Sequence, residues 1–316
     1  MTSAKKAPVC VLGTGLIGGS LLRAAVAAGY ACWGYNRSAS GARAARADGF
    51  DVTEDLTATL RRAAETDALI VVAVPMPAVE RMLSAIATYA PGCTLTDVVS
   101  VKAPVAAAVR AHGLADRYVG GHPMAGTAES GWAATDPELF RDAVWAVGVD
   151  EGTHAEPWSR VVRLALDCGA VVVPVVAAEH DRAVARISHL PHVLAEALAT
   201  AGAAGGELAL GLAAGSFRDG TRVAGTAPDL VRAICEPNSA ALLEVLDETL
   251  RVLGSARESL REKQSLADLV EAGHDARQRY ESARRWEVTD VRPGAPNWLE
   301  DLRAAGNRGG VITRLG

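Results

Sequence analysis

A histidine between glycines and a proline is the most unusual chemical feature of this sequence. His122 stands in the run Gly-Gly-His-Pro-Met-Ala-Gly-Thr, so we expect it on a constrained turn rather than inside a helix. An imidazole titrates near neutral pH and suits a general base that takes a hydroxyl proton while a hydride leaves the same carbinol. A histidine with a purely structural role is the alternative. Thr127 and Glu129 follow closely and are candidate substrate-binding residues, Glu129 as a gate or an orienting group.

A second polar group follows an apolar run at Asp97-Val-Val-Ser-Val-Lys. Ser100 would lie at the carboxyl edge of a strand, where its hydroxyl could bond a substrate hydroxyl or a nicotinamide amide. Helix capping by Ser100 and a surface charge at Lys102 are the alternatives, and spacing alone favours them.

The second half of the chain carries a cluster of polar residues in Ser-His-Leu-Pro-His. Ser188 and His192 are four residues apart and share a helix face, and His189 lies near them at a spacing of three. Pro191 removes a backbone donor and should kink the helix. Two histidines without clustered carboxylates or cysteines are weak support for a metal site, so we predict substrate contacts and no metal.

Arg222 ends the run Phe-Arg-Asp-Gly-Thr-Arg and is a candidate to bind a substrate carboxylate through two parallel hydrogen bonds. The alternative is an ion pair within the loop, with Asp219 or Asp229 as the partner.

The elements that position these residues begin with a glycine-rich turn. A β-branched run at 9–12 leads into Gly-Thr-Gly-Leu-Ile-Gly, a helical pattern at 20–28 and a second apolar run at 31–35. A strand, a turn, a helix and a second strand within residues 9–35 predict a dinucleotide-binding unit, with the phosphates at the helix N-terminus. The alternative is a glycine-rich turn in another α/β protein. The candidate cofactor contacts are Gly13, Gly15, Leu16, Ile17 and Gly18.

The end of the second strand bears on the type of cofactor. NAD-binding units usually place a carboxylate there, and this sequence has Asn36, Arg37 and Ser38 instead. A guanidinium with two short polar groups suits a ribose 2′-phosphate, so we predict NADP as the favoured cofactor and NAD as the alternative. Val74 and Pro75 follow a later strand and are candidate nicotinamide contacts, although a plain strand-ending turn explains them equally well.

Apolar runs at 68–74, 94–99, 119–121, 143–149 and 171–176 predict further strands. Continuous rather than alternating apolar runs indicate strands covered on both faces, so the fold class is α/β with a doubly wound parallel sheet that the later strands extend. Residues 177–285 show helical periodicity, including a long helix from Ser239 to Leu253. We therefore expect a Rossmann domain at 1–176, an all-α substrate and dimerisation domain at 177–285, and a tail at 286–316 that packs on the surface or stays partly mobile.

Composition narrows the function classes. The 316 residues carry 32 Lys and Arg against 37 Asp and Glu, for a net charge of −5, which disfavours nucleic acid and anionic membranes as partners. Five cysteines without a C-x-x-C pair fit a reducing cytoplasm, and no apolar run is long enough to span a bilayer. Apolar stripes in the helical half predict a homodimer.

Taken together, the motifs resemble the prephenate/arogenate dehydrogenase family of tyrosine biosynthesis. The resemblance runs from about Val9 to Arg285 and is carried by the segments at 13–21, 97–102, 121–127, 188–192 and 217–222. It implies NAD(P)-dependent oxidative decarboxylation of prephenate to 4-hydroxyphenylpyruvate. It also implies His122 as the base, support of the hydroxyl and nicotinamide by Ser100, and substrate contacts by Ser188, His192 and Arg222.

Arogenate dehydrogenase is the close alternative, in which the substrate side chain bears an ammonium group rather than a keto group. A non-catalytic NADP-sensing protein is a remote one, because a sensor needs neither a base nor a carboxylate clamp.

Overall fold

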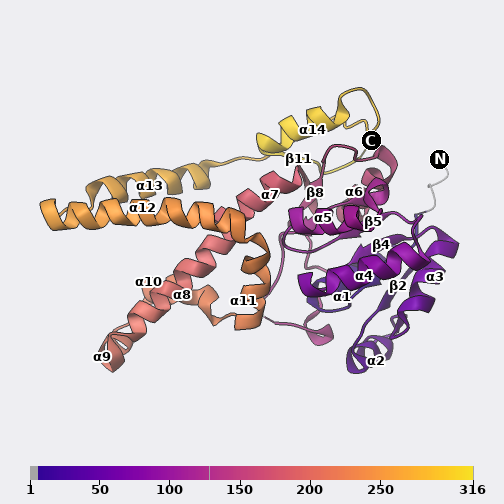
Figure 1. Cartoon of the computed structure of the whole chain (residues 1–316), viewed down its shortest axis with the longest axis horizontal. Helices are drawn as coiled ribbons and strands as arrows, with labels where there is room; N and C mark the ends of the chain where they lie inside the picture. The colour runs from indigo at the N-terminus through magenta and orange to yellow at the C-terminus, as the bar shows by residue number, and fades with distance from the viewer. Residues whose placement is uncertain (1–5, 128, 316) are drawn as a thin grey trace. The chain divides into compact units, whose positions relative to one another are not determined.

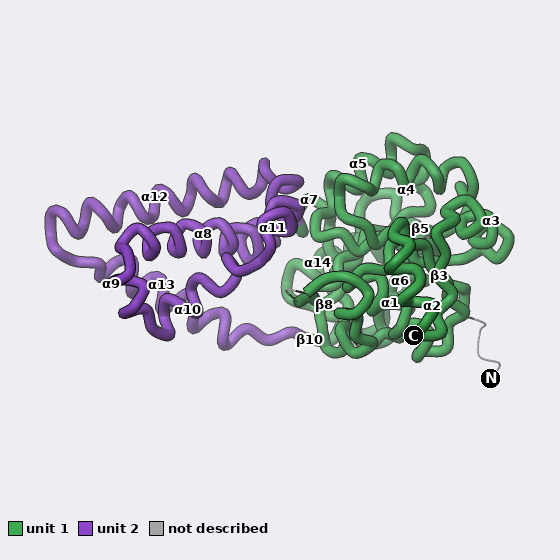
Figure 2. Tube along the Cα trace, turned by 90° about the horizontal axis from the view of Figure 1, so that it is seen from below, with its two compact units in different colours: residues 1–180, 286–316 green, residues 181–285 purple. Residues whose placement is uncertain are grey.

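The computed structural model describes residues 6–127 and 129–315 and divides into two compact units. The first unit comprises residues up to His180 together with Trp286–Gly316, and the second comprises Asp181–Arg285 (Figure 2). The first unit therefore ends four residues beyond the boundary expected at 176, and the C-terminal segment folds with it.

The main sheet of the first unit is parallel and has the strand order β3-β2-β1-β4-β5-β6, the Rossmann arrangement. Strands are added in one direction from β1 to β3 and in the opposite direction from β4 to β6. The loops after β1 and β4 therefore flank the crevice where such folds bind ligands. The strands are β1 (Val9–Leu12), β2 (Cys32–Tyr35), β3 (Val52–Thr53), β4 (Leu69–Val72), β5 (Leu95–Asp97) and β6 (Tyr118–Val119).

Helices cover both faces of this sheet, as its continuous apolar runs predict. Val9 and Val11 of β1 belong to one buried cluster, whereas Cys10 and Leu12 belong to another, because successive side chains of a strand point to opposite faces. In Figure 2, α3, α4 and α5 lie on one side of the strands, and α1, α2 and α6 lie on the other. The helices are α1 (Leu16–Ala27), α2 (Ala39–Ala47), α3 (Leu56–Thr66), α4 (Met76–Tyr89), α5 (Ala103–Ala111) and α6 (Ala155–Asp167).

The prediction that the later strands extend the Rossmann sheet is confirmed for β6, which overlaps the run at 119–121, and is wrong for the runs at 143–149 and 171–176. β7 (Gly121–Pro123), β8 (Val144–Gly148) and β9 (Val171–Val175) form a separate sheet in which β7 runs antiparallel to β8. A single residue, Gly120, separates β6 from β7, and the chain changes sheets there. A side chain at Gly121 would lie 2.7 Å from the Asp97 carbonyl oxygen, so only glycine lets β7 approach the end of β5 this closely.

The C-terminal segment is folded onto the first unit. Ile312 is fully buried and forms an antiparallel bridge with Val172 of β9. Gly306 packs against β9 so closely that a Cβ there would lie 1.9 Å from the Pro174 carbonyl oxygen. The segment contains β10 (Trp286–Glu287), α14 (Trp298–Asn307) and β11 (Gly310–Val311).

The second unit is helical throughout, as predicted (Figure 1). Its longest helix begins at Ser239 as expected but continues to Lys263, ten residues beyond the predicted end. The unit contains the last residues of α7 (Ala177–Val184), a π-helical turn (Ala185–His189), α8 (Leu190–Ala203), α9 (Gly206–Gly211), α10 (Gly215–Thr221), α11 (Pro228–Cys235), α12 (Ser239–Lys263) and α13 (Ala267–Ser282).

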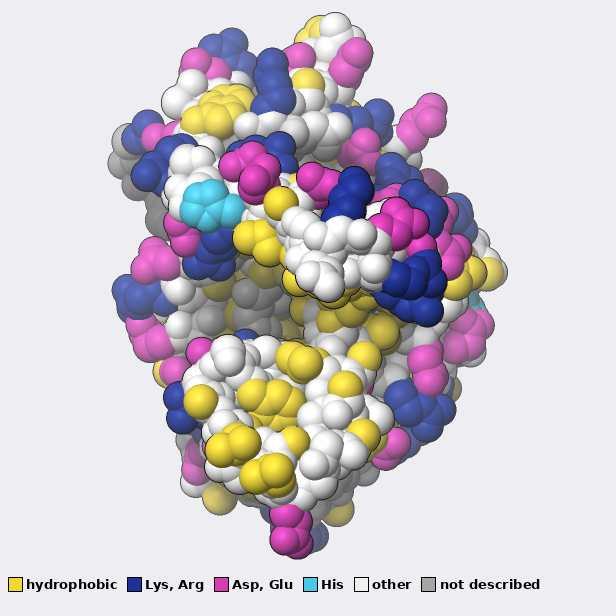
Figure 3. Space-filling view, turned by 90° about the vertical axis from the view of Figure 1, so that its left-hand side faces the viewer, with side chains coloured by type: hydrophobic (Ala, Val, Ile, Leu, Met, Phe, Trp, Pro, Cys, Tyr) yellow, Lys and Arg dark blue, Asp and Glu magenta, His cyan; other side chains and the backbone are white. Residues whose placement is uncertain are grey.

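Large apolar side chains remain exposed on this helical unit. Leu208 and Leu212 are 76% and 74% exposed, and Figure 3 shows hydrophobic side chains gathered on the end of the unit. Exposed apolar area of this kind usually marks an interaction surface. Among the described residues, no helix combines the length and apolarity that a membrane crossing requires.

Candidate active site

The glycine turn after β1 has the geometry of a phosphate-binding loop. Gly13 has φ +102°, and a Cβ at Gly18 would lie 1.9 Å from the Gly13 carbonyl oxygen, so both positions require glycine. A Cβ at Gly15, in contrast, would meet no protein atom within 4 Å. Gly15 precedes α1, whose first turn has neither a side-chain cap nor an acidic residue. The open space and the uncapped backbone N–H groups fit a dinucleotide pyrophosphate.

The other predicted contacts of this loop lie around the same turn. Leu16 and Ile17 open α1 and are half-buried. Val74 packs beside the turn, because its Cγ1 would lie 2.9 Å from a Cβ at Gly13. Pro75 is exposed and directly precedes α4. The carboxyl ends of β1 and β4 thus bring all of these residues to one edge of the sheet.

The residues after β2 form a second part of this edge. Asn36 Nδ2 donates to Thr14 Oγ1 at 2.8 Å, which connects this loop to the glycine turn. The Asn36 side chain also accepts from the backbone N–H of Ser38, and the Ser38 hydroxyl accepts from the Gly41 N–H at the start of α2. Arg37 is exposed and makes no ion pair within residues 6–127 and 129–315. Its guanidinium is thus available to a ligand.

A buried ion pair anchors the strand that carries the candidate base. Lys102 and Asp97 are 3% and 1% exposed and pair with each other, and Lys102 Nζ also donates to the Gly121 carbonyl oxygen at 2.6 Å. Asp97 accepts a further bond from the Tyr118 hydroxyl at 2.7 Å. The prediction, favoured by spacing alone, that Lys102 is a surface charge is therefore wrong. Its ammonium ties the residue before His122 to the carboxyl end of β5.

His122 lies on β7 and is half-buried. Its Nδ1 lies 2.9 Å from Nε2 of His180, which belongs to α7 and is 3% exposed. His180 could not be identified from the sequence, because 58 residues separate the two histidines and no local motif marks the second one.

The remaining predicted residues of the first unit lie in nearby segments of the chain. Ser100 is half-buried in the loop between β5 and α5, whose shape is fixed by the Val99 N–H donating to Asp97 Oδ1 at 2.8 Å. Thr127 and Glu129 are exposed, and the Glu129 N–H donates to Thr127 Oγ1.

In the helical unit, the predicted polar cluster separates into buried and accessible parts. His189 is 1% exposed, and its Nδ1 lies 3.1 Å from Asn238 Nδ2, which also donates to the Asp181 carbonyl oxygen. These contacts favour a structural role for His189 in place of the predicted substrate contact. Ser188 and His192 are half-buried, and Nδ1 of His192 is buried without a hydrogen-bond partner.

The π-helical turn at 185–189 directly precedes Pro191. Since proline cannot donate the i to i−4 hydrogen bond, the helix widens there, and such turns are frequent at functional sites.

Arg222 lies just after α10 and is exposed. No ion pair joins it to Asp219 or Asp229 in the part of the chain that the structure describes. The predicted alternative of a loop ion pair is therefore not seen, and the guanidinium can receive a carboxylate.

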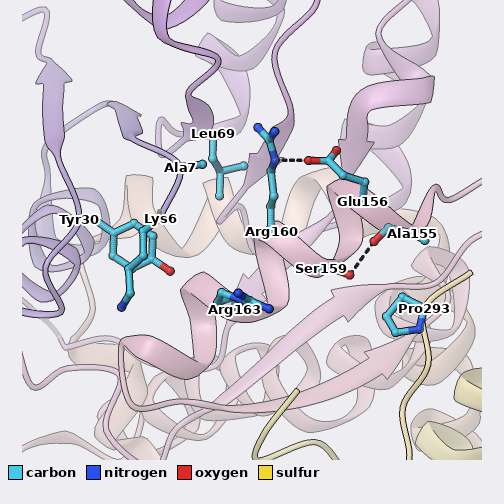
Figure 4. A pocket seen from close by; sticks show the side chains of 10 residues that line it. All are labelled: Lys6, Ala7, Tyr30, Leu69, Ala155, Glu156, Ser159, Arg160, Arg163 and Pro293. Carbon is cyan, nitrogen blue, oxygen red and sulfur yellow. Dashed lines mark hydrogen bonds and ion pairs between the residues drawn. The ribbon is translucent and has the colours of Figure 1, made fainter. Parts of the chain in front are cut away.

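A hollow of about 500 Å³ lies at the opposite edge of the Rossmann sheet (Figure 4). It is lined by residues that precede β1 and β2, including Lys6 and Tyr30, and by the start of α6. Lys6 pairs with Asp167, and Arg160 pairs with Asp67 and Glu156, so most of its charges are already satisfied. This hollow is distinct from the nucleotide crevice. Within residues 6–127 and 129–315, no group of three or more His, Cys, Asp or Glu side chains could hold a metal ion.

Two family models match consecutive parts of the chain. Residues 22–174 match the family model described as prephenate dehydrogenase, nucleotide-binding domain, and residues 176–272 match prephenate dehydrogenase, dimerization domain. The chain belongs to the prephenate dehydrogenase family. It is accordingly an oxidoreductase with a nicotinamide cofactor, and the predicted family, fold class and enzyme class are confirmed.

Individual relatives of this chain are named for different substrates. A candidate prephenate dehydrogenase from Corynebacterium glutamicum is 51% identical, with a TM-score of 0.93 over 98% of this chain and 99% of the other. Cyclohexadienyl dehydrogenase from Zymomonas mobilis is 32% identical over 80% of this chain and 88% of its own length. Arogenate dehydrogenase from Synechocystis is 30% identical, with a TM-score of 0.74 over 86% of this chain and 99% of the other.

Proposed function

We propose that this protein is a prephenate dehydrogenase that oxidatively decarboxylates prephenate to 4-hydroxyphenylpyruvate in tyrosine biosynthesis. The observation that carries the proposal is the attachment of His122 to the carboxyl edge of the nucleotide-binding sheet. Gly121, its neighbour, accepts a bond from Lys102 and donates one to Asp97 at the end of β5. An imidazole is thereby held at the edge where a Rossmann fold binds its nicotinamide.

The chain's own residues supply the acid–base and binding chemistry. The cofactor, when bound in the glycine turn, supplies the hydride acceptor. His122 accepts the proton of the hydroxyl group on the carbon that loses the hydride. The ring carboxylate leaves as carbon dioxide, and the electrons of that bond make the ring aromatic. Ser100 supports the hydroxyl, and Ser188, His192 and Arg222 hold the polar groups of the substrate. Thr127 and Glu129 border the substrate site.

The test is the purified protein with prephenate, followed by reduced-nicotinamide absorbance. His122→Asn should lower kcat by about 10²–10⁴ if the imidazole is the base. His112→Asn is the matched control, because His112 is half-buried at the end of α5 and pairs with the exposed Glu80, and such a pair contributes little. A His122→Asn enzyme with the kcat of the unsubstituted protein contradicts the base role.

Arogenate is a second candidate substrate, because two relatives are named arogenate dehydrogenase and cyclohexadienyl dehydrogenase. Arogenate carries an ammonium group where prephenate carries a keto group, and the same base and carboxylate clamp serve both. Parallel assays with the two substrates decide between them. Arg222→Ala should mainly raise KM, with Arg218→Ala, on the preceding helix α10, as its control.

We also propose NADP as the favoured cofactor, since Arg37 is exposed and unpaired next to Asn36 and Ser38. Arg37→Ala should lower kcat/KM for NADP relative to NAD by about tenfold, the size expected when one charged hydrogen bond is lost. Arg43→Ala, on the exposed face of α2, should leave that ratio unchanged. An unchanged ratio in Arg37→Ala defeats the NADP assignment.

The protein is proposed to act as a cytoplasmic homodimer. The dimerization-domain match and the exposed leucines of the helical unit support the dimer, and five unpaired cysteines support a reducing compartment. Light scattering that gives a mass of 32.7 kDa in solution would rule the dimer out.

A further inference from the structure

Two histidines, one on β7 and one on α7, are in direct contact. Nδ1 of His122 and Nε2 of His180 are 2.9 Å apart, and the rings meet edge to face at an interplanar angle of 71°. Both histidines belong to the first unit, so this contact lies within one compact body. His180 is almost fully buried, whereas His122 is only half-buried.

The position of His180 is fixed by backbone contacts that do not involve His122. The N–H of Ala177, at the start of α7, donates to Asp150 Oδ1 at 3.0 Å, and the His180 N–H donates to the Val176 carbonyl oxygen. The helix therefore presents Nε2 of His180 from a rigid support, and the His122 ring must orient to meet it.

A hydrogen bond between two neutral imidazoles has a direction, because one nitrogen must donate and the other must accept. If Nδ1 of His122 carries the hydrogen, its Nε2 holds a lone pair and can take a proton from the substrate. If His180 is the donor, Nδ1 of a neutral His122 is the acceptor and Nε2 carries the hydrogen, so that Nε2 cannot act as a base. The direction of this one bond thus decides whether His122 is competent.

We propose that His180 is a positioning residue that accepts from His122 Nδ1–H and so holds His122 in the base-competent tautomer. This inference rests on the proposed function, since it assigns a partner to the base of that reaction. When Nε2 accepts the substrate proton, the Nδ1–H···Nε2 bond becomes charge-assisted and stabilises the imidazolium. Aspartate performs this service for histidine in serine proteases, where its loss leaves the wrong tautomer. Here a buried imidazole takes that place.

Two variants that differ by one methylene group test the proposal. The amide of His180→Gln reaches as far as Nε2 and still offers an acceptor, whereas the amide of His180→Asn is too short to meet His122. We expect kcat to fall about 10–100-fold in His180→Asn, the usual cost of losing an orienting partner, and to stay within about threefold in His180→Gln. KM for the nicotinamide cofactor should not change in either variant, because His180 does not line the glycine turn.

The tautomer is also measured directly, without turnover. Long-range ¹H–¹⁵N spectra of the histidine-labelled protein distinguish a protonated Nδ1 from a protonated Nε2, and the His122 signals are those missing from His122→Asn. The proposal expects Nδ1–H in the unsubstituted protein and in His180→Gln. A predominant Nε2–H at His122 overturns it, even if His180→Asn fails to fold.

The kinetic outcomes are separable from a failure of the proposed function. Equal losses in the two variants, or a His180→Asn enzyme within twofold of the unsubstituted protein, overturn the positioning role and leave prephenate oxidation intact. An unsubstituted protein that oxidises neither prephenate nor arogenate defeats the proposed function, and the spectra still report the tautomer.

Discussion

Replacing Lys102 with methionine should destabilise the first unit strongly, because the change leaves the buried carboxylate of Asp97 without its cation. Breaking a buried ion pair from one side costs about 3–5 kcal/mol. Asp97 keeps the bonds from the Tyr118 hydroxyl and the Val99 N–H, so the lower end, about 3 kcal/mol, is expected. For a unit of this size that corresponds to a fall in Tm of about 6–12 °C.

Tryptophan fluorescence during guanidinium unfolding measures this loss selectively. All six tryptophans of the chain belong to the first unit, so the signal reports that unit and not the helical one. Lys6→Met is the matched control, since its pair with Asp167 is about one-third exposed and should contribute at most about 1 kcal/mol. The double variant Asp97→Asn/Lys102→Met should lose less than the sum of the single changes.

A Lys102→Met protein that unfolds within about 1 kcal/mol of the unsubstituted protein, or no differently from Lys6→Met, would refute the stabilising role of the buried pair. Full additivity in the double variant would also refute it, because the two side chains would then not be coupled.

Further predictions concern the turn, the thiols and the C-terminal segment. Gly15→Ala should weaken cofactor binding in a fluorescence titration without lowering Tm, whereas Gly18→Ala should lower both, since only the second Cβ collides with the protein. Burial raises the pKa of Cys32 and of Cys168 to about 12, so a thiol reagent at pH 8 should label neither in the folded protein and both after unfolding. Rapid labelling under native conditions would contradict these raised pKa values. Gly306→Ala should destabilise the first unit by about 1–3 kcal/mol through its collision with β9, and an unchanged unfolding midpoint would show that α14 does not dock there.

The Rossmann sheet was predictable because its apolar runs are short and uninterrupted. Val9–Leu12 forms β1 at the residues that the pattern indicated, since both of its faces are covered and every position must be apolar. The second sheet was not predictable, because pairing depends on which strands meet after a bend. The switch at Gly120 involves one residue, and β7 has only three, too few for a hydrophobic period to show.

Local sequence also identified single residues of the site better than their partners. His122 stood out because its neighbours fix the backbone, but nothing near His180 distinguishes it from a helix residue. Lys102 resembled a surface lysine, since a lone charge after a strand normally meets solvent. Its burial results from long-range contacts with Asp97 and Gly121, which a one-dimensional pattern does not contain.

The return of residues 286–316 to the first unit has a consequence for how the protein is made. Ile312 completes the packing of β9, so the nucleotide-binding unit lacks part of its core until Ile312 has emerged from the ribosome. The whole helical unit is synthesised in the interval, and it can fold while its host is still incomplete. Nonsense codons or proteolytic nicks between residues 286 and 312 should therefore damage the domain encoded first.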